Sequence, residues 1–268
     1  MFGLLLAIAA PALAAEPAGA LTDRALVEAI QTYQRHAELP LPLPGPKRRA
    51  QLLSGKLVRM RLPSAEGQPV GAMALQITDL SLAELWIGTV DEDMGNGADE
   101  VLSHHMPRTG GEMFRWYGYV DMPSPVTDRH FLIQTTVNAR LHSATEGQMW
   151  ARHWRMEPGG EATMRAEVAR GAVEGVTPDR FEDAIWVPHN TGSWVFIDLP
   201  GGKSLLGYQA TASLGGSFPD SLVNRYVYWG LERIMEEMLG QARRARGHYR
   251  AGHAPIEGGD GRPLPAFP

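Results

Sequence analysis

The sequence contains no cysteine among its 268 residues. Disulfide bonds, thiolate metal ligands and cysteine nucleophiles are therefore excluded for this chain. Positive charge is not in excess either, because 25 Lys and Arg face 30 Asp and Glu and give a net charge of −5. A nucleic-acid-binding surface needs a basic field, so we expect no nucleic-acid partner.

Motifs of common catalytic and cofactor sites are also missing. The sequence has no H-E-x-x-H, no G-x-S-x-G and no G-x-G-x-x-G, which removes the usual signals of a zinc protease, a serine hydrolase and a dinucleotide site. His104 and His105 are adjacent, so their side chains point to opposite sides of a strand and cannot easily share an ion. The acidic loop from Asp91 to Glu100 lacks the ligand pattern of a calcium loop. We therefore expect no metal and no cofactor.

Long apolar runs are absent too, since no stretch reaches the 18 residues of a membrane span. A shorter apolar run from Phe2 to Leu13 is followed by small residues. This pattern is typical of a cleavable signal peptide, although no Lys or Arg precedes the run. We predict a signal peptide over residues 1–15, and hence a periplasmic or secreted protein.

What is present is a pattern of helices at both ends and strands between them. Helix starts are predicted at Thr22 and at Ser81, where Glu84 follows three residues later as in a capping box. A long helix is predicted from Asp220 to about Gly247, and residues 159–183 indicate a loop or short helix. Alternating apolar residues predict strands over 56–62, 70–78, 114–120, 131–137, 149–156, 184–189, 193–199 and 204–214.

This order of elements predicts an α+β domain over residues 16–250, with an antiparallel sheet. The apolar stripe of the long C-terminal helix is wide enough to lie across the concave face of a curved sheet. Residues 251–268 are rich in Gly and Pro. We predict that this tail is disordered.

Several stretches resemble a known family. The string PSPVTDRHF at residues 123–131 resembles the P-x-P-V-x-D-R-D-F signature of START domains, the lipid-transfer modules of the helix-grip or Bet v-like superfamily. Downstream, GSWVFIDL at 192–199, GKSLLGY at 202–208, GGSFP at 215–219 and LVN at 222–224 resemble the rest of the family pattern. The chain departs from it at His130, where the family usually has Asp.

The resemblance implies a curved sheet that grips the C-terminal helix, with a lipid or other apolar small molecule in the cavity between them. Arg152 shares a strand face with two tryptophans, so it would hold a polar ligand head if that face points inward; otherwise it lies over exposed tryptophans. The predicted cavity residues are Trp116, Ile133, Trp150, Arg152, Trp154, Trp194, Tyr208, Tyr226, Met235 and Met238. Ligand entry is predicted at the turn of Gly215, Gly216 and Pro219, where two glycines give hinge freedom.

Asp128 and Arg129 lie directly before a strand and have two readings. In the first, they pin the start of that strand by charge-assisted hydrogen bonds. In the second, Arg129 points into the cavity and holds a ligand head.

The function that we expect is non-catalytic binding and transfer of the ligand, with a transient membrane contact. One alternative is a polyketide cyclase-like or hydrolase-like enzyme of the same superfamily, with His153, His189 or Glu182 as acid or base. Another is a cell-envelope interaction protein that has no ligand.

Overall fold

The computed structural model describes residues 19–62, 69–91, 94, 101–111, 113–216 and 220–268, and within α7 it describes only the backbone of residues 220–227 and 229. Nine strands form one sheet in the order β1-β2-β9-β8-β6-β5-β4-β3, with β7 beside β5. Neighbouring strands are antiparallel except β5 and β7. The strands are β1 (Val58–Leu62), β2 (Val70–Thr78), β3 (Val101–Met106), β4 (Phe114–Val120), β5 (Arg129–Val137), β6 (Met149–Met156), β7 (Ile185–Trp186), β8 (His189–Leu199) and β9 (Lys203–Ser213).

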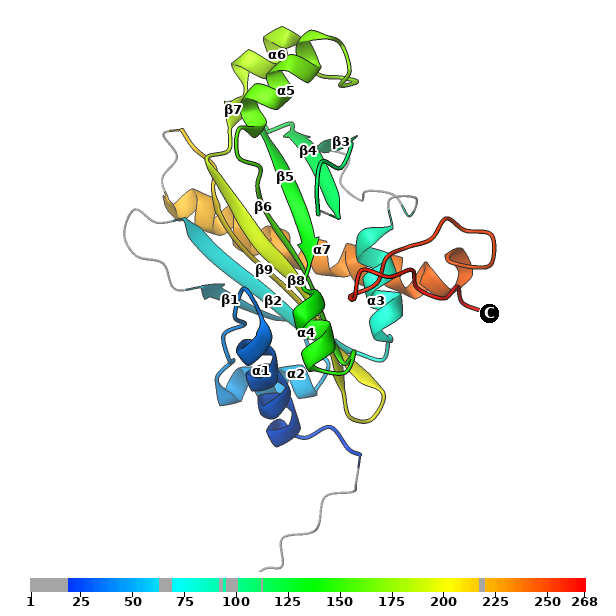
Figure 1. Cartoon of the computed structure of the whole chain (residues 1–268). Coiled ribbons are helices and arrows are strands. Elements are labelled where there is room, and N and C mark those ends of the chain that lie inside the picture. Colours follow the sequence, from blue (N-terminus) through cyan, green and yellow to red (C-terminus); the bar gives the residue numbers. More distant parts are fainter. Residues whose placement is uncertain (1–18, 63–68, 92–93, 95–100, 112, 217–219) are drawn as a thin grey trace, which may run out of the picture.

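The long helix α7 (Asp220–His248) crosses one face of the sheet, and α3 (Leu82–Val90) lies beside it (Figure 1). We call this the inner face; Phe131, Trp154, Trp194 and Phe196 belong to its core. The two helices approach closely at Gly88, where a Cβ atom would lie 2.5 Å from the backbone nitrogen of Ala242. This arrangement confirms the predicted α+β helix-grip architecture.

The opposite, outer face is covered at one end by α1 (Asp23–His36), α2 (Pro46–Leu53) and α4 (Ala139–Ala144) (Figure 1). Leu26 and Ile30 of α1 are fully buried, as are Val195 and Ile197 of β8. The oxygen of Thr22 accepts a hydrogen bond from Ala25 N at 3.2 Å, so the predicted N-cap is confirmed.

The other end of the outer face is covered by α5 (Gly160–Ala169) and α6 (Pro178–Asp183). Under them lies His130, which is 1% exposed and has its Nδ1 3.0 Å from the hydroxyl of Tyr117. The rings of Phe181 and Trp186 complete the aromatic surroundings, at centroid distances of 4.4 and 5.1 Å. Burial lowers the pKa of His130 to about 4, so the residue that departs from the family signature is neutral here.

The C-terminal tail differs from the predicted disorder. The indole of Trp86 donates a hydrogen bond to Glu257 O at 2.7 Å, and the hydroxyl of Tyr249 donates one to Leu264 O at 2.8 Å. A Cβ atom on Gly259 would lie 2.5 Å from Cγ of Trp150. The glycine content that indicated disorder therefore allows the tail to pack directly on an indole.

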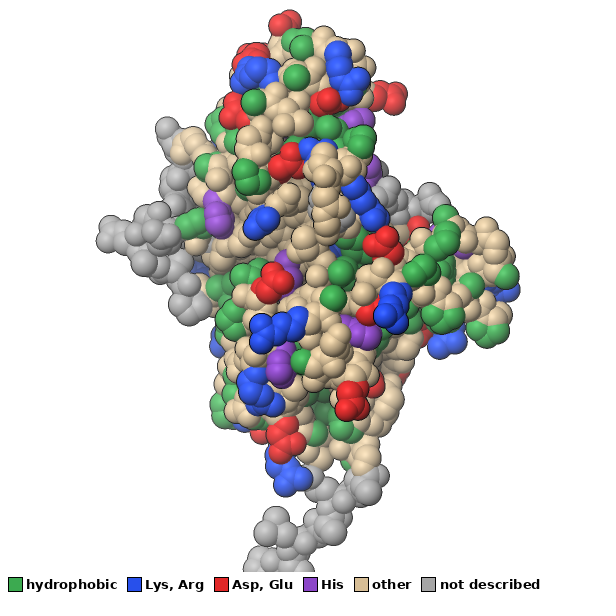
Figure 2. Space-filling view, viewed as in Figure 1, with side chains coloured by type: hydrophobic (Ala, Val, Ile, Leu, Met, Phe, Trp, Pro, Cys, Tyr) green, Lys and Arg blue, Asp and Glu red, His purple; other side chains and the backbone are tan. Residues whose placement is uncertain are grey.

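The described chain has no helix long and apolar enough to span a bilayer. The predicted signal peptide lies outside the described residues. On the surface shown in Figure 2, acidic and basic side chains are interspersed.

Candidate functional site

A cavity of about 340 Å³ lies between the inner face of the sheet and α7. Its wall includes aromatic side chains from five strands, together with the end of α3 and one side of α7. The aromatic lining residues are Phe114, Trp116, Phe131, Trp154, Trp194 and Tyr208.

Strand alternation explains why these rings share one face. Residues two apart on a strand point the same way, and on β5 this brings Phe131, Ile133 and Thr135 to the cavity. The ring of Phe131 packs edge-on against that of Trp116, with centroids 5.3 Å apart. Beneath the rings the neighbouring strands carry glycine: a Cβ on Gly192 would lie 2.3 Å from the indole of Trp154. The aromatic wall is therefore tightly fixed in position.

Arg152 brings a positive charge to this apolar lining. Its guanidinium carbon lies 5.7 Å from the ring centroid of Phe114. Burial raises the pKa of Tyr208 to about 12, although the charge of Arg152 acts in the opposite direction. Tyr208 is thus a neutral phenol at physiological pH, and the strand face carrying Arg152 points inward.

Part of the remaining polar lining is used within the protein. Asn190 Oδ1 accepts the indole N–H of Trp154 at 2.9 Å, and the hydroxyl of Thr135 accepts Phe114 N at 3.1 Å. These bonds satisfy polar groups of the wall itself. The result is a mainly aromatic and aliphatic cavity with a few polar groups.

Of the ten predicted cavity residues, seven line this cavity: Trp116, Ile133, Arg152, Trp154, Trp194, Tyr208 and Met238. Trp150 is on the same face but packs edge-on against Trp86, with centroids 5.4 Å apart, and lies under Gly259. Met235 is fully buried in the core of the inner face and does not line the cavity. The side chain of Tyr226 lies outside the described atoms.

The sequence interpretation missed other lining residues. Phe114 and Phe131 could have been found, because they lie two residues before Trp116 and Ile133 and therefore share their strand faces. Asp91 and His105 also line the cavity, but they come from the end of α3 and from β3. Only the tertiary arrangement brings those two segments to the cavity.

Asp128 and Arg129 bond to separate partners. Asp128 accepts the hydroxyl of Tyr119 at 2.8 Å and the backbone N–H of Met122 at 2.9 Å. Arg129 is 2% exposed; it donates to Leu214 O at 2.9 Å and Gly215 O at 3.2 Å, and also to the carbonyl of Thr127. These bonds fit the structural reading, since they fix both the loop after β4 and the turn after β9.

That turn holds two of the predicted gate residues. Gly215 and Gly216 have φ angles of +67° and +75°, a region that favours glycine. A Cβ atom on Gly216 would lie 3.0 Å from Cδ1 of Ile185. Pro219 lies outside the described residues.

The three residues considered as an acid or base lie away from the cavity lining. His153 is buried on the outer face, where burial lowers its pKa. His189 Nε2 lies 3.1 Å from the hydroxyl of Thr211, and Glu182 is exposed and ion-paired with Arg165. These residues do not form a convergent pair in the cavity.

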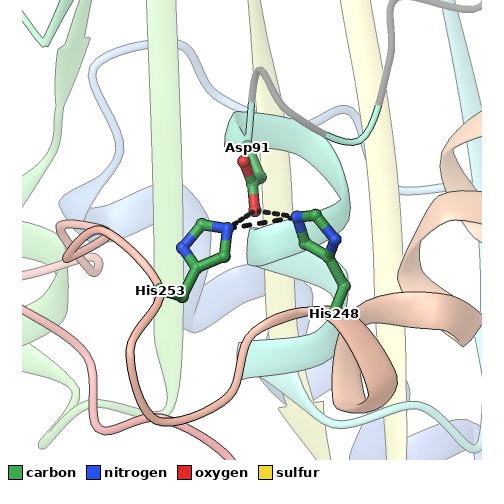
Figure 3. A group of neighbouring side chains, drawn as sticks. All are labelled: Asp91, His248 and His253. Carbon is green, nitrogen blue, oxygen red and sulfur yellow. Dashed lines mark hydrogen bonds and ion pairs between the residues drawn. The ribbon is translucent and has the colours of Figure 1, made fainter.

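A group able to hold a metal lies where the end of α3, the end of α7 and the C-terminal tail meet. Asp91, His248 and His253 each direct one ligand atom to a common point (Figure 3). The Nε2 atoms of His248 and His253 lie 3.0 and 3.4 Å from Asp91 Oδ2.

No family model and no curated protein sequence matches the chain. Among solved structures, human STARD10 is similar at 11% identity and a TM-score of 0.50, over 78% of this chain and 83% of that one. Human StAR-related lipid transfer protein 5 is similar at 13% identity and a TM-score of 0.50, over 83% of this chain and 95% of that one. Identity this low bears on the fold alone, and these comparisons show that this chain has the fold of a START-like domain.

Proposed function

We propose that this chain binds a lipid or other apolar small molecule in the inner cavity and transfers it without chemical change. The observation that carries the proposal is the aromatic cavity between the sheet and α7. Known small-molecule sites are concave, mainly apolar and furnished with few polar groups, as this cavity is. The START-like fold supports the same function by analogy.

The size and charge of the cavity narrow the ligand class. Its volume of about 340 Å³ is at the lower end of the ~300–1,000 Å³ of small-molecule sites. This favours a compact ligand with one chain or fused rings over a two-chain phospholipid. Arg152 supplies a charge that suits an acidic or hydroxylated head, because a guanidinium pairs well with oxygen acceptors.

Non-catalytic binding is preferred because His153, His189 and Glu182 lie away from this lining. Of the titratable residues that do line it, Asp91 pairs with two histidines outside the lining, and the His105 ring packs edge-on against Phe114. Tyr208, whose pKa is raised to about 12 by burial, is suited to donating a hydrogen bond. It is not suited to acting as a base near neutral pH. An enzyme of the cyclase or hydrolase kind would instead convert its ligand on incubation.

The first experiment is native mass spectrometry of the chain after incubation with mixed lipid vesicles. We expect one adduct of several hundred daltons per chain, released unchanged on denaturation. A bare mass would overturn the proposal, and a chemically altered ligand would favour the enzyme.

Met238→Trp should fill the cavity and reduce the adduct, whereas Glu236→Trp, on the exposed side of the same helix, should not.

We also propose that the ligand exchanges past Gly215 and Gly216, in a protein exported to the periplasm and in transient contact with a membrane. Gly216→Val should slow exchange at least several-fold, because the added atoms meet Ile185. Gly202→Val is the matched control: Gly202 also has a positive φ, of +67°, but a Cβ there meets nothing within 4 Å. Equal exchange rates in the two variants would contradict the gate.

A further inference from the structure

Two parts of the chain that are distant in sequence meet at the end of α3: residue 91, and the end of α7 with the tail that follows it. Asp91 follows the last turn of α3, His248 ends α7, and His253 comes from the packed tail (Figure 3). The two histidine Nε2 atoms are 3.2 Å apart, and they lie 3.0 and 3.4 Å from Asp91 Oδ2. The side chains of Asp91 and His253 are only 5% and 14% exposed, and that of His248 is 31% exposed.

We propose that Asp91, His248 and His253 bind a divalent transition-metal ion of the Zn²⁺ class. Zinc bonds to imidazole nitrogen and carboxylate oxygen are about 2.0–2.1 Å long, so neighbouring donor atoms of a tetrahedral site are separated by about 3.3 Å. The three separations here, 3.0, 3.2 and 3.4 Å, match one face of such a tetrahedron. The fourth position is left for water or a further ligand.

The orientation of the His253 ring supports this assignment. Its Nδ1 lies 2.8 Å from the carbonyl oxygen of Ala254. A carbonyl oxygen only accepts hydrogen bonds, so Nδ1 carries the proton, and in the neutral ring the lone pair is on Nε2. That lone pair faces the group formed by Asp91 and His248. A hydrogen bond from the second ring nitrogen to a backbone carbonyl is also how metal-binding histidines are usually oriented.

The backbone adds negative potential at the same point. Asp91 is the C-cap of α3, where its N–H bonds to Ile87 O, and His248 is in the last turn of α7. The carboxyl ends of helices carry partial negative charge and stabilise cations. Two helix ends and one carboxylate therefore favour a positive charge between them.

The donor set indicates which ions would bind. Two imidazoles and one carboxylate suit zinc and its first-row neighbours, whereas Mg²⁺ and Ca²⁺ prefer oxygen ligands. A bound ion would join the end of α3, the end of α7 and the tail. It would also lie at the wall of the cavity, since Asp91 lines that wall.

The test uses the full, untagged chain, stripped with a chelator and then titrated with Zn²⁺ by calorimetry and with Co²⁺ by visible absorption. We expect one ion per chain and the intense absorption bands of low-coordinate Co²⁺. His253→Gln and Asp91→Asn should each weaken binding by about 100-fold, at least as much as loss of an outer-shell partner does. His36→Gln is the control, because His36 ends α1 on the outer face.

X-ray absorption of the Zn²⁺-loaded wild-type chain provides a test that needs no variant. We expect two imidazole ligands per zinc. The proposal is overturned if the spectrum shows fewer, if Mg²⁺ competes equally with Zn²⁺, or if His36→Gln weakens binding as much as His253→Gln does.

Discussion

The two faces of the sheet are packed differently, although the same strands contribute side chains to both. On β8, Val195 and Ile197 point outward into a fully buried core, whereas Trp194 and Phe196 point inward to the aromatic core around the cavity. Branched aliphatic side chains can interdigitate and fill space. On the inner face, by contrast, large rings are fixed edge-on against one another. The helix α7 lies across these rings without filling the space between itself and the sheet, and a cavity remains. A single alternating strand can thus supply a dense core to one face and a binding cavity to the other.

The largest expected difference between the faces is in stability. Ile197→Ala on the outer face should lower the free energy of unfolding by about 2–5 kcal/mol, because it leaves a void in a packed core. Met238→Ala on the inner face should cost less than half as much, because Met238 already borders a cavity. Urea unfolding of both variants measures the difference. Equal losses would mean that the faces are equally well packed.

Acid should destabilise the outer face through His130. Its pKa is about 4 in the folded chain and 6.5 in the unfolded chain, because burial disfavours the charged ring. Above pH 6.5 there is no penalty; as the pH falls from 6.5 to 4, only the unfolded state binds the proton and stability decreases. The difference of 2.5 between the two pKa values corresponds to roughly 3–4 kcal/mol, at about 1.4 kcal/mol for each pH unit.

His130→Phe should flatten this part of the stability profile, measured by denaturant unfolding at each pH. His36→Gln should leave the profile as it is, since His36 is only partly buried at the end of α1. If the His130 variant kept the full acid dependence, another buried group, such as His153, would have to account for it.

Replacing the charge on the inner face should alter ligand preference more than stability. Arg152→Met should lower the affinity for a fatty acid by about tenfold relative to the matching fatty alcohol, since a charge-assisted hydrogen bond is lost. Arg140→Met removes the same charge from the exposed surface of α4 and should have no such effect. Competition with a fluorescent fatty acid gives both affinities. An unchanged ratio would show that Arg152 does not contact the head.

The smallest expected effect compares a helix cap from each face. Ser81→Ala should cost about 1 kcal/mol, and Thr22→Ala somewhat less. The reason is that Ser81 forms a capping box with Glu84, which also accepts a hydrogen bond from Arg246 of α7 at 2.6 Å. Thr22 makes only the cap contact with Ala25 among the bonds described for its side chain. Thermal unfolding of the two variants measures both losses of stability. A larger loss for Thr22→Ala than for Ser81→Ala would contradict this prediction.

Local sequence patterns predicted much of the fold. The bounds of β2 and β6 were predicted correctly, as was the capping box at Ser81, because alternation and capping depend on neighbouring residues. The helices α5 and α6 were only partly foreseen, in a region expected to be a loop or short helix. Their burial depends on contact with strands that come earlier in the chain.

The candidate site, too, was predictable from the sequence only in part. The face to which Trp116 and Trp154 belong followed from alternation, but where the cavity ends along that face did not. Trp150 shares the face and is covered by the tail, an arrangement that no local pattern indicates. Asp91 and His248 are similarly brought together by the packing of α3 on α7.

The tail has a practical consequence for handling the protein. Glu257 O is the partner of the Trp86 indole, and Gly259 covers Trp150. A chain shortened at Arg250 would leave one indole N–H without that partner and expose two large rings on adjoining elements. Exposed aromatic surface of this kind drives self-association. Trimming the Gly- and Pro-rich end to improve crystallisation or solubility would therefore have the opposite effect.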